Sequence, residues 1–426
     1  MDSKVRDDHS LVRTTLDLML QAGKLLFANG QTTERIMCAL KELATAGGFK
    51  PAIFVEWGQL RVHLDNGFES HSGAISVEPA GVDMNKVNAT MSLIHRVDEG
   101  TMDLAAARSA LQRISESPPV FLIRFALLAA VGAAALGVIF GVDHPTTLIL
   151  IALVAGAGAC LRRWLAKCSH NLFIQPFCAA LLAGIVGAIA VHLNLSSDQR
   201  LIAVCPCMIL VPGPHLLNGA LDLARARIPL GIARIVYATV VTLTISTGLV
   251  LGLACGGAGL APGGTSTIVP LGYDVLAAGV AVAAYGTFFN MSWSVLPIPI
   301  AVGMLAHGCR WGAITLTGVN AATGALIACL IVGIIMTPIA DRLHLPFAGL
   351  AFASVVSLIP GSYLFRMGGG MASLLAFGTK ASPDLFFQVL DDGIGAILIV
   401  VAMTFGLVAP RIFWPESFRK GEHKTV

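Results

Sequence analysis

The sequence contains few charged residues: 12% of its 426 residues are Asp, Glu, Lys or Arg, whereas 55% are hydrophobic. A soluble protein of this size carries about a quarter charged residues. From about residue 118 onward, the chain is therefore expected to be an integral membrane protein. The formal net charge of +3 is small and no basic stripe stands out, so nucleic acid is not expected as a partner.

Three further absences narrow the function. The polar N-terminus, MDSKVRDDHS, lacks the hydrophobic region of a signal peptide, so about 115 residues are expected to fold in the cytosol before the first membrane segment. The motif GxxxxGK[ST] does not occur, which argues against ATP-driven transport by this chain alone. Cys205 and Cys207 have neither CxxC spacing nor a second pair, so no metal and no cofactor is expected.

The first 117 residues are predicted to form a small cytosolic α+β domain. Helical spacing of apolar residues ends at Asn29-Gly30, and a second helix follows Thr32 and ends at Gly47-Gly48. The segment 52–77, with its Asp65-Asn66-Gly67 turn, is typical of a β-meander. Two more helices are expected at about 83–97 and 103–114.

The remaining chain is predicted to be a polytopic α-helical membrane protein with about ten spans. Each candidate is near the 20 residues that a bilayer requires. The candidates lie at about 120–141, 144–161, 171–193, 199–217, 229–254, 274–290, 295–309, 319–340, 346–364 and 384–409. Lys and Arg then gather on the side of the N-terminal domain, which favours two cytosolic termini. The predicted units are a first five-span module at 118–256, a second at 270–412 and a cytosolic tail at 413–426.

Two similar motifs lie at matching places in these modules. LVPG at 210–213 and LIPG at 358–361 place Pro212 and Pro360 148 positions apart. Because five spans is an odd number, the second module would enter the bilayer from the opposite face, giving the inverted-topology repeat of many secondary transporters. In such proteins the substrate site lies near the midplane, where helices are interrupted.

The two interruptions are candidates for a shared polar site. Proline lacks an N–H, and unpaired backbone groups in a membrane are tolerated only inside protein or beside a water-filled cavity. Pro212, Gly213 and Pro214 of the first module, with Pro360 and Gly361 of the second, are therefore predicted to contribute to substrate binding. The alternative is that both are simple kinks that shape helix packing.

Polar residues follow each interruption. His215, with an ordinary pKa of about 6.5, could exchange protons, or it could be a neutral histidine bonded to a freed carbonyl. Asn218 and Asp222 share its helix face, although Asp222 could instead be a solvated residue beside Arg225. In the second module Ser362, Tyr363 and Arg366 occupy the matching region. Arg366 could hold a substrate carboxylate or lie at the external membrane surface.

Carboxylates in the last span are further candidates for proton coupling. Asp391 and Asp392 lie about eight residues into it, where two adjacent carboxylates are hard to explain by packing. They would be in headgroup water if the span starts near Gly393. Asn290 and His307 are weaker candidates for the substrate site.

Several stretches resemble the threonine/serine exporter family. They are LVPGPHLLNGALDL, LLFANGQTTERIMCALKELATAGGF and RVDEGTMDLAAARSALQRI, together with FFNMSWSVLPIPIAVGML through SLIPGSYLFRMGGGM in the second half. The resemblance implies proton-driven export of small hydroxy amino acids by ten spans of the cytoplasmic membrane. Some two-subunit relatives are linked to succinate export instead.

The sequence therefore predicts a secondary exporter and not an enzyme, with a small molecule, protons and the lipid bilayer as partners. One alternative is an exporter of a small dicarboxylate such as succinate. Others are a membrane-anchored sensor or scaffold and a membrane hydrolase, against which the repeat and the intramembrane polar groups argue. Whether the chain forms a homo-oligomer is left open.

Overall fold

The structure is a computed structural model and is mostly helical. It describes residues 2–65, 70–79, 81–142, 144–169, 171–193, 199–257, 269–343, 345 and 347–413.

The N-terminal region, residues 2–116, has the predicted order of helices and strands. Its elements are α1 (Asp2–Ala28), α2 (Thr33–Ala46), β1 (Lys50–Glu56), β2 (Gly58–Asp65), β3 (Ser70–Val77), α3 (Met84–Asp98) and α4 (Leu104–Glu116). The strands form one antiparallel sheet in the order β1-β2-β3, as a meander requires. The expected turn residues Asn66 and Gly67 lie outside the described residues. Asn29-Gly30 ends α1 because Gly30 adopts a left-handed φ of +89°.

Ten segments follow, at the places predicted for membrane spans. They are α5 (Leu122–Ile139), α6 (Pro145–Cys168), α7 (Ile174–His192), α8 (Gln199–Met208) with α9 (Gly213–Ala224), α10 (Ile228–Cys255), α11 (Leu271–Phe288), α12 (Pro297–Thr317), α13 (Ala321–Arg342), α14 (Phe347–Val355) with η1 (Val356–Leu358) and α15 (Gly361–Phe377), and α16 (Pro383–Phe413). Among the described helices, seven are long and apolar enough to cross a membrane, or eight if the bent pair α8–α9 is one span. The chain is therefore a polytopic helical membrane protein, and the count of ten remains a prediction.

Four of the predicted spans end well before their helices do: the fourth, expected at 199–217, continues to Ala224, and the ninth, expected at 346–364, continues to Phe377. The seventh span was expected to be short, at 295–309, but α12 has 21 residues and continues to Thr317. The second span was expected to end at 161, but α6 continues to Cys168. Apolarity set the predicted ends, whereas the helices continue through Arg162, Arg163 and Arg310 because backbone hydrogen bonding does not stop at a charged residue.

Both predicted interruptions break a helix. The axis bends by 53° between α8 and α9, where Pro212 precedes Gly213. In the second case the helix tightens into η1 before Pro360 and restarts at Gly361. The carbonyl of Met208 lies four residues before Pro212, which has no N–H to offer it. The hydroxyl of Tyr285 donates to this carbonyl at 2.6 Å, so the break is stabilised by a side chain of another helix.

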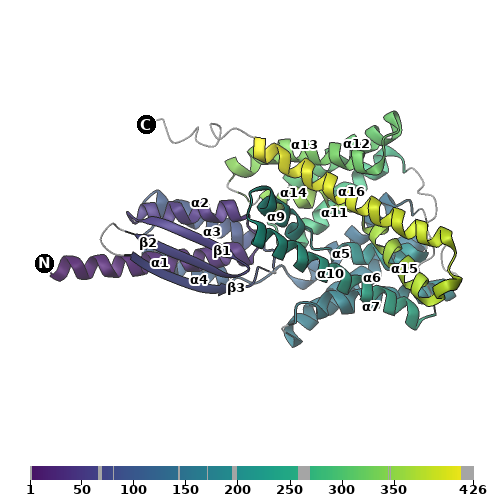
Figure 1. Cartoon of the computed structure of the whole chain (residues 1–426), viewed down its shortest axis with the longest axis horizontal. Coiled ribbons are helices and arrows are strands. Elements are labelled where there is room, and N and C mark those ends of the chain that lie inside the picture. Colours follow the sequence, from purple (N-terminus) through teal and green to yellow (C-terminus); the bar gives the residue numbers. More distant parts are fainter. Residues whose placement is uncertain are drawn as a thin grey trace.

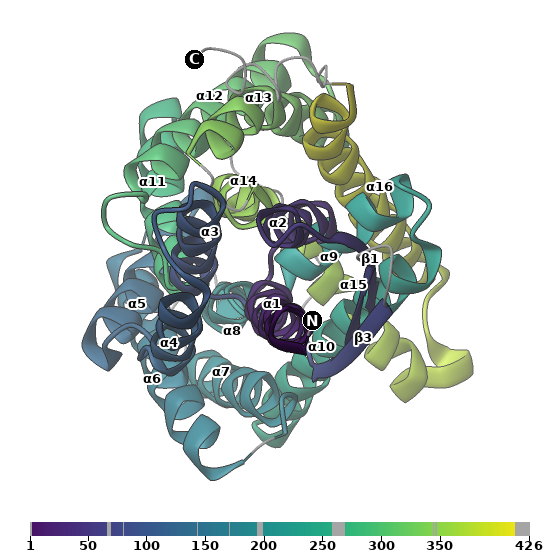
Figure 2. The ribbon, with the colours of Figure 1, turned by 90° about the vertical axis from the view of Figure 1, so that its left-hand side faces the viewer.

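Helix neighbours repeat between α5–α10, called here the first half, and α11–α16, the second half. Helix α10 packs on α7 as α16 packs on α13, and α5 packs on α6 as α11 packs on α12. The contacts between halves are also reciprocal, because α9 touches α14 and α15 touches α8. In Figure 2 the helices of the two halves surround α8, α9 and α14, which lie inside.

The equivalent helices α5 and α11 run antiparallel to each other. Phe125, near the start of α5, stacks on Phe288 at the end of α11, with ring centroids 5.7 Å apart. Further along α5, Gly132 meets Ala284, which precedes Phe288 on α11. The order of contacts is therefore reversed along the two helices.

The N-terminal region stands on one end of the helical bundle (Figure 1). It has a hydrophobic core of its own, which also includes Leu230 of α10. In return, Met84 at the start of α3 belongs to the core of the bundle and donates its backbone N–H to the carbonyl of Phe289 at 2.9 Å. Each part thus places a side chain in the other, which fixes their relative position.

Candidate functional site

A cavity of about 340 Å³ lies between the N-terminal region, the first break and the end of α11. Its lining includes four residues predicted for the substrate site: Pro212, Pro214, His215 and Asn290. The other polar and charged lining residues are Asp83, Arg162, Arg163, Gln175, Tyr237 and Thr287. A volume of this size suits a small organic molecule.

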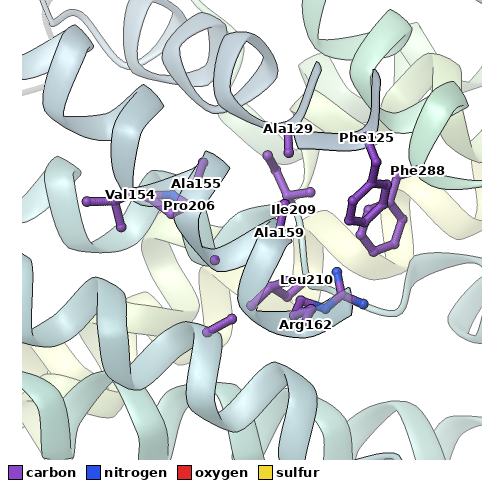
Figure 3. A pocket seen from close by; sticks show the side chains of 12 residues that line it. Phe125, Ala129, Val154, Ala155, Ala159, Arg162, Pro206, Ile209, Leu210 and Phe288 are labelled. Carbon is purple, nitrogen blue, oxygen red and sulfur yellow. The ribbon is translucent and has the colours of Figure 1, made fainter. Parts of the chain in front are cut away.

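A smaller hollow of about 20 Å³ shares lining residues with this cavity (Figure 3). Phe125, Arg162, Leu210 and Phe288 line both, so the two spaces are neighbours. The rest of the hollow is apolar, with Ala159 and Ile209 among its walls. The polar cavity therefore narrows toward an apolar space at Arg162.

Two arginines of α6 supply the positive charge of the cavity. Arg163 donates to the carbonyl of Val120 at 3.1 Å and lies over the ring of Phe125. The guanidinium of Arg162 lies 4.7 Å from the ring centroid of Phe288. Within the described part of the chain Arg162 has no acidic partner, and its buried Nε makes no hydrogen bond. Arg162 is thus the cation of this cavity with bonding capacity left for an anion.

His215 is held at the first break by packing. Its side chain is 4% exposed, and its ring meets that of Tyr237 edge-on, with centroids 5.0 Å apart. It follows the two prolines that start α9, so the bend of the chain directs it into the cavity wall.

Asn218 and Asp222, one and two turns further along α9, contact the N-terminal region instead of the cavity. The amide of Asn218 donates to the carbonyl of Gly30 at 3.0 Å. The carboxylate of Asp222 accepts from the hydroxyl of Thr33 at 3.0 Å and pairs with Arg234 at 3.1 Å. Asp222 is 1% exposed, so the expectation of a solvated residue beside Arg225 is wrong. Arg225 pairs with Glu34 of α2, and Arg227 with Asp222 at 3.4 Å.

Asn290 joins the other edge of the cavity to the N-terminal region. Its backbone is left-handed, with φ +57°, which Asn tolerates better than most residues. Its amide donates to Asp83 at 2.7 Å and its carbonyl oxygen accepts from the N–H of Val120 at 3.2 Å. Asp83 also caps α3 by accepting from the N–H of Lys86. Asn290 therefore shapes the cavity mouth.

Apart from Asn290, the residues predicted in the second half do not line this cavity. Nε and Nη2 of Arg366 both donate to Oδ1 of Asp392, at 2.9 and 2.5 Å, and the guanidinium lies over the ring of Tyr363. Asp391 is exposed, and the side chain of Ser362 is not described. Gly361 packs against Met208 of α8.

The two breaks do meet, although their shared space is apolar. Gly213 and Pro360 both line a hollow of about 30 Å³ together with Phe352, Ile359 and Met403. A Cβ atom at Gly213 would lie within 1.4 Å of the Phe352 ring, so glycine is required for this contact. The sequence thus predicted the meeting of the breaks, while the polar cavity lies to one side.

Sequence reasoning missed Arg162, which it placed among the cytosolic charges, and Arg234, which is 0% exposed. A signal for Arg162 was available, because Arg310 follows it by 148 positions, the same separation as the two prolines. No comparable pattern marks Arg234. Its partners are Asp222 of α9, and Phe27 of α1 and Thr33 of α2, which lie about 200 residues earlier.

A bundle of apolar helices in two matching halves, with broken helices meeting inside and a polar cavity at one break, defines a membrane carrier. Residues 17–256 match the family model described as "Putative threonine/serine exporter", and residues 274–413 match "Threonine/Serine exporter, ThrE". The chain belongs to the threonine/serine exporter family. It is therefore a membrane exporter and not an enzyme.

One curated relative is a "Probable threonine/serine exporter" of Mycobacterium tuberculosis. It is 23% identical over 394 residues, which cover 87% of this chain and 72% of the relative. No solved structure matches the chain.

Proposed function

We propose that this protein exports threonine and serine across the cytoplasmic membrane in exchange for protons. The observation that carries the proposal is the cavity at the first break, in which Arg162 has no acidic partner among the described residues and is accompanied by hydroxyl, amide and imidazole groups. Family membership and the name of the curated relative support the substrate class.

The chemistry of the cavity suits a small hydroxy amino acid. The guanidinium of Arg162 can take the carboxylate in two parallel hydrogen bonds. His215 and Tyr237 offer polar atoms on α9 and α10, and Asp83 places negative charge near the mouth, where an ammonium group would be favoured. The small side chain of serine or threonine could then point toward the hollow lined by Ala159 and Ile209.

An inverted repeat would supply the transport movement. The antiparallel contact of α5 with α11 and the reciprocal contacts of α8 with α15 and of α9 with α14 support it. In such proteins one half rocks against the other around a fixed site. In this proposal the N-terminal region and both termini are cytosolic, so the cavity beside that region would load substrate from the cytosol. The domain limits 1–117, 118–256 and 270–412 belong to the same proposal.

Proton coupling needs a titrating group that senses the transport cycle. Of the residues predicted for it, His215 faces the cavity, whereas Asp222 and Asp392 are ion-paired and Asp391 is exposed. His215 is therefore the candidate among these four that a bound substrate would contact.

The test uses purified protein in liposomes loaded with labelled serine, threonine or succinate. With the exterior acidified, we expect saturable efflux of serine and threonine that collapses with a protonophore. Arg162→Gln should raise the apparent KM for serine about tenfold or more, since hydrogen bonds to charged groups contribute about 1.5–3 kcal/mol.

Arg163→Gln is the matched control, because the neighbouring guanidinium is held by Val120 and Phe125, and its KM should change less than threefold. Absence of flux for all three solutes would contradict the proposed function. Equal effects of the two substitutions would remove Arg162 from the site.

A further inference from the structure

A chain of three buried polar side chains lies in the second half, away from the cavity. The Nδ1 atom of His307, on α12, is 3.0 Å from a carboxylate oxygen of Asp274 on α11. Its Nε2 atom is 2.6 Å from the hydroxyl of Ser357 in η1. His307 is 0% exposed, Ser357 4% and Asp274 5%. Ionisable groups inside a membrane protein are costly and rare, so such a chain calls for a function.

This cluster of Asp274, His307 and Ser357 lies toward the end of the bundle opposite the N-terminal region. Asp274 is in the first turn of α11, whereas the carbonyl of Phe289, just past the end of this helix, accepts from Met84 of the N-terminal region. Fourteen helical residues separate Asp274 from Phe288, which is about 21 Å along the axis. A group bound by Asp274 and His307 would therefore come from the side opposite to the one that loads the cavity.

The positions of the first half that correspond to His307 and Ser357 hold no titratable residue. At the separation of 148 positions that relates the two prolines, Arg310 corresponds to Arg162, His307 to Ala159 and Ser357 to Ile209. Ala159, Ile209 and Arg162 line the small apolar hollow of Figure 3. The arginine is thus repeated in both halves, whereas the imidazole and hydroxyl occur only in the second.

Protonation of His307 would reverse a hydrogen bond at the second break. An ionised Asp274 can only accept, so Nδ1 carries a hydrogen and a neutral imidazole must accept at Nε2 from the Ser357 hydroxyl. When Nε2 gains a proton, it donates to Ser357 instead, and the hydroxyl hydrogen must turn to another acceptor. Ser357 is three residues before Pro360, so protonation changes a hydrogen bond at the place where the helix is already interrupted.

We infer that Asp274, His307 and Ser357 form a proton-binding site of this exporter, separate from His215 of the cavity, an inference that rests on the proposed function. One proton enters from the side away from the N-terminal region, binds at Nε2 of His307 as the imidazolium ion, and leaves from the same atom after the halves have rocked. Asp274 stabilises the imidazolium, and the reversed hydrogen bond of Ser357 alters the bonding at the second break. Among the described residues, Arg310 on α12 interacts electrostatically with Asp274, and Cys329 on α13 and Tyr363 on α15 interact in turn with Arg310.

The experiment compares two transport modes in liposomes. Export driven by a pH gradient requires proton turnover, whereas counterflow of labelled serine at equal pH requires only substrate exchange. Asp274→Asn and His307→Gln should each lower gradient-driven export at least tenfold and keep counterflow within about threefold of the unaltered protein. Ser357→Ala should keep both modes but shift the pH midpoint of driven export by at least half a pH unit.

Asp341→Asn is the matched control, since Asp341 of α13 is also a carboxylate paired with a cation, Arg411 at 3.1 Å. Asp341→Asn should leave both gradient-driven export and counterflow at the level of the unaltered protein. Gradient-driven export that persists in Asp274→Asn and His307→Gln overturns the inference. It is also overturned if these two variants lose both modes equally and Ser357→Ala leaves the pH midpoint unshifted. Failure of the proposed function is distinct, because the unaltered protein would then move no solute in either mode.

Discussion

The first and second halves of the helical bundle share a pattern of helix contacts but differ in what covers their breaks. At the first break, α9 is held by the N-terminal region through Asn218, Asp222 and Arg234. At the second break no such domain is present among the described residues, and Arg366 pairs with Asp392 of the same half. The two halves thus have the same arrangement of helices, whereas the residues that contact each break differ.

This comparison also shows how the N-terminal region contributes to the cavity. The N-terminal region reaches the first half through the Asn29–Gly30 turn and the second half through Asp83 and Met84, and the cavity lies between these points and the broken helix. In the second half, His307 and Ser357 stand at the positions that Ala159 and Ile209 of the small hollow hold in the first half. The cavity thus forms where the N-terminal region joins the two halves.

The largest expected effect is the loss of the buried cation that holds the first break. Arg234→Met would leave the carboxylate of Asp222, 1% exposed, without its closest charged partner. Removing one member of a buried pair costs about 3–5 kcal/mol. We expect a large fall in the apparent melting temperature of the detergent-solubilised protein and low yields in the membrane.

The double variant Asp222→Asn with Arg234→Met should recover part of this loss, because no uncompensated charge remains. Arg411→Met in the second half is the comparison, since its partner Asp341 is 30% exposed and water can solvate it. An equal loss from Arg411→Met would show that the two halves do not differ in this way.

A smaller effect is expected from methyl groups added at the two breaks. The Cβ atom of Gly213→Ala would lie 1.4 Å from a carbon of the Phe352 ring, so the ring or the helix must move. The Cβ of Gly361→Ala would lie 2.8 Å from the terminal methyl of Met208, which is flexible and can turn away. We expect Gly213→Ala to cost about 1–3 kcal/mol and Gly361→Ala about 1 kcal/mol or less.

Thermal unfolding of the purified variants measures this difference. Gly213→Ala combined with Phe352→Leu should be more stable than Gly213→Ala alone, because the smaller side chain leaves room for the methyl group. If both glycines tolerate alanine equally, the contact of Gly213 with Phe352 does not hold the breaks together.

The sequence predicts the elements of this protein better than the contacts between them. Hydrophobic length located ten helical segments, and the Pro-Gly pairs located both breaks, since proline and glycine act through the local backbone. The partners of the polar residues could not be predicted. Asp222 is held by Thr33, 189 residues earlier, and Arg366 by Asp392, 26 residues later, and neither separation follows from a local pattern.

The same limit applies to the candidate site. His215 and Asn290 were predicted from being polar in apolar segments, and both line the cavity. Arg162 has an equally apolar setting but lies beside Arg163 near a predicted span end, where a charge is ordinarily solvated. Only their contacts distinguish these two arginines, because Arg162 lies over the ring of Phe288 whereas Arg163 is held by Val120 and Phe125.

The smallest expected effect concerns the ion pair of the second half. Arg366 and Asp392 keep 26% and 14% of their side chains exposed, and partly exposed pairs contribute about 0.2–1 kcal/mol. Arg366→Gln should therefore lower stability slightly and leave the apparent KM for serine within about twofold, in contrast to Arg162→Gln. A tenfold rise in KM for Arg366→Gln would instead mean that Arg366 exchanges Asp392 for the substrate carboxylate during the cycle. The site would then be shared between the halves, and the functional difference drawn between them would fail.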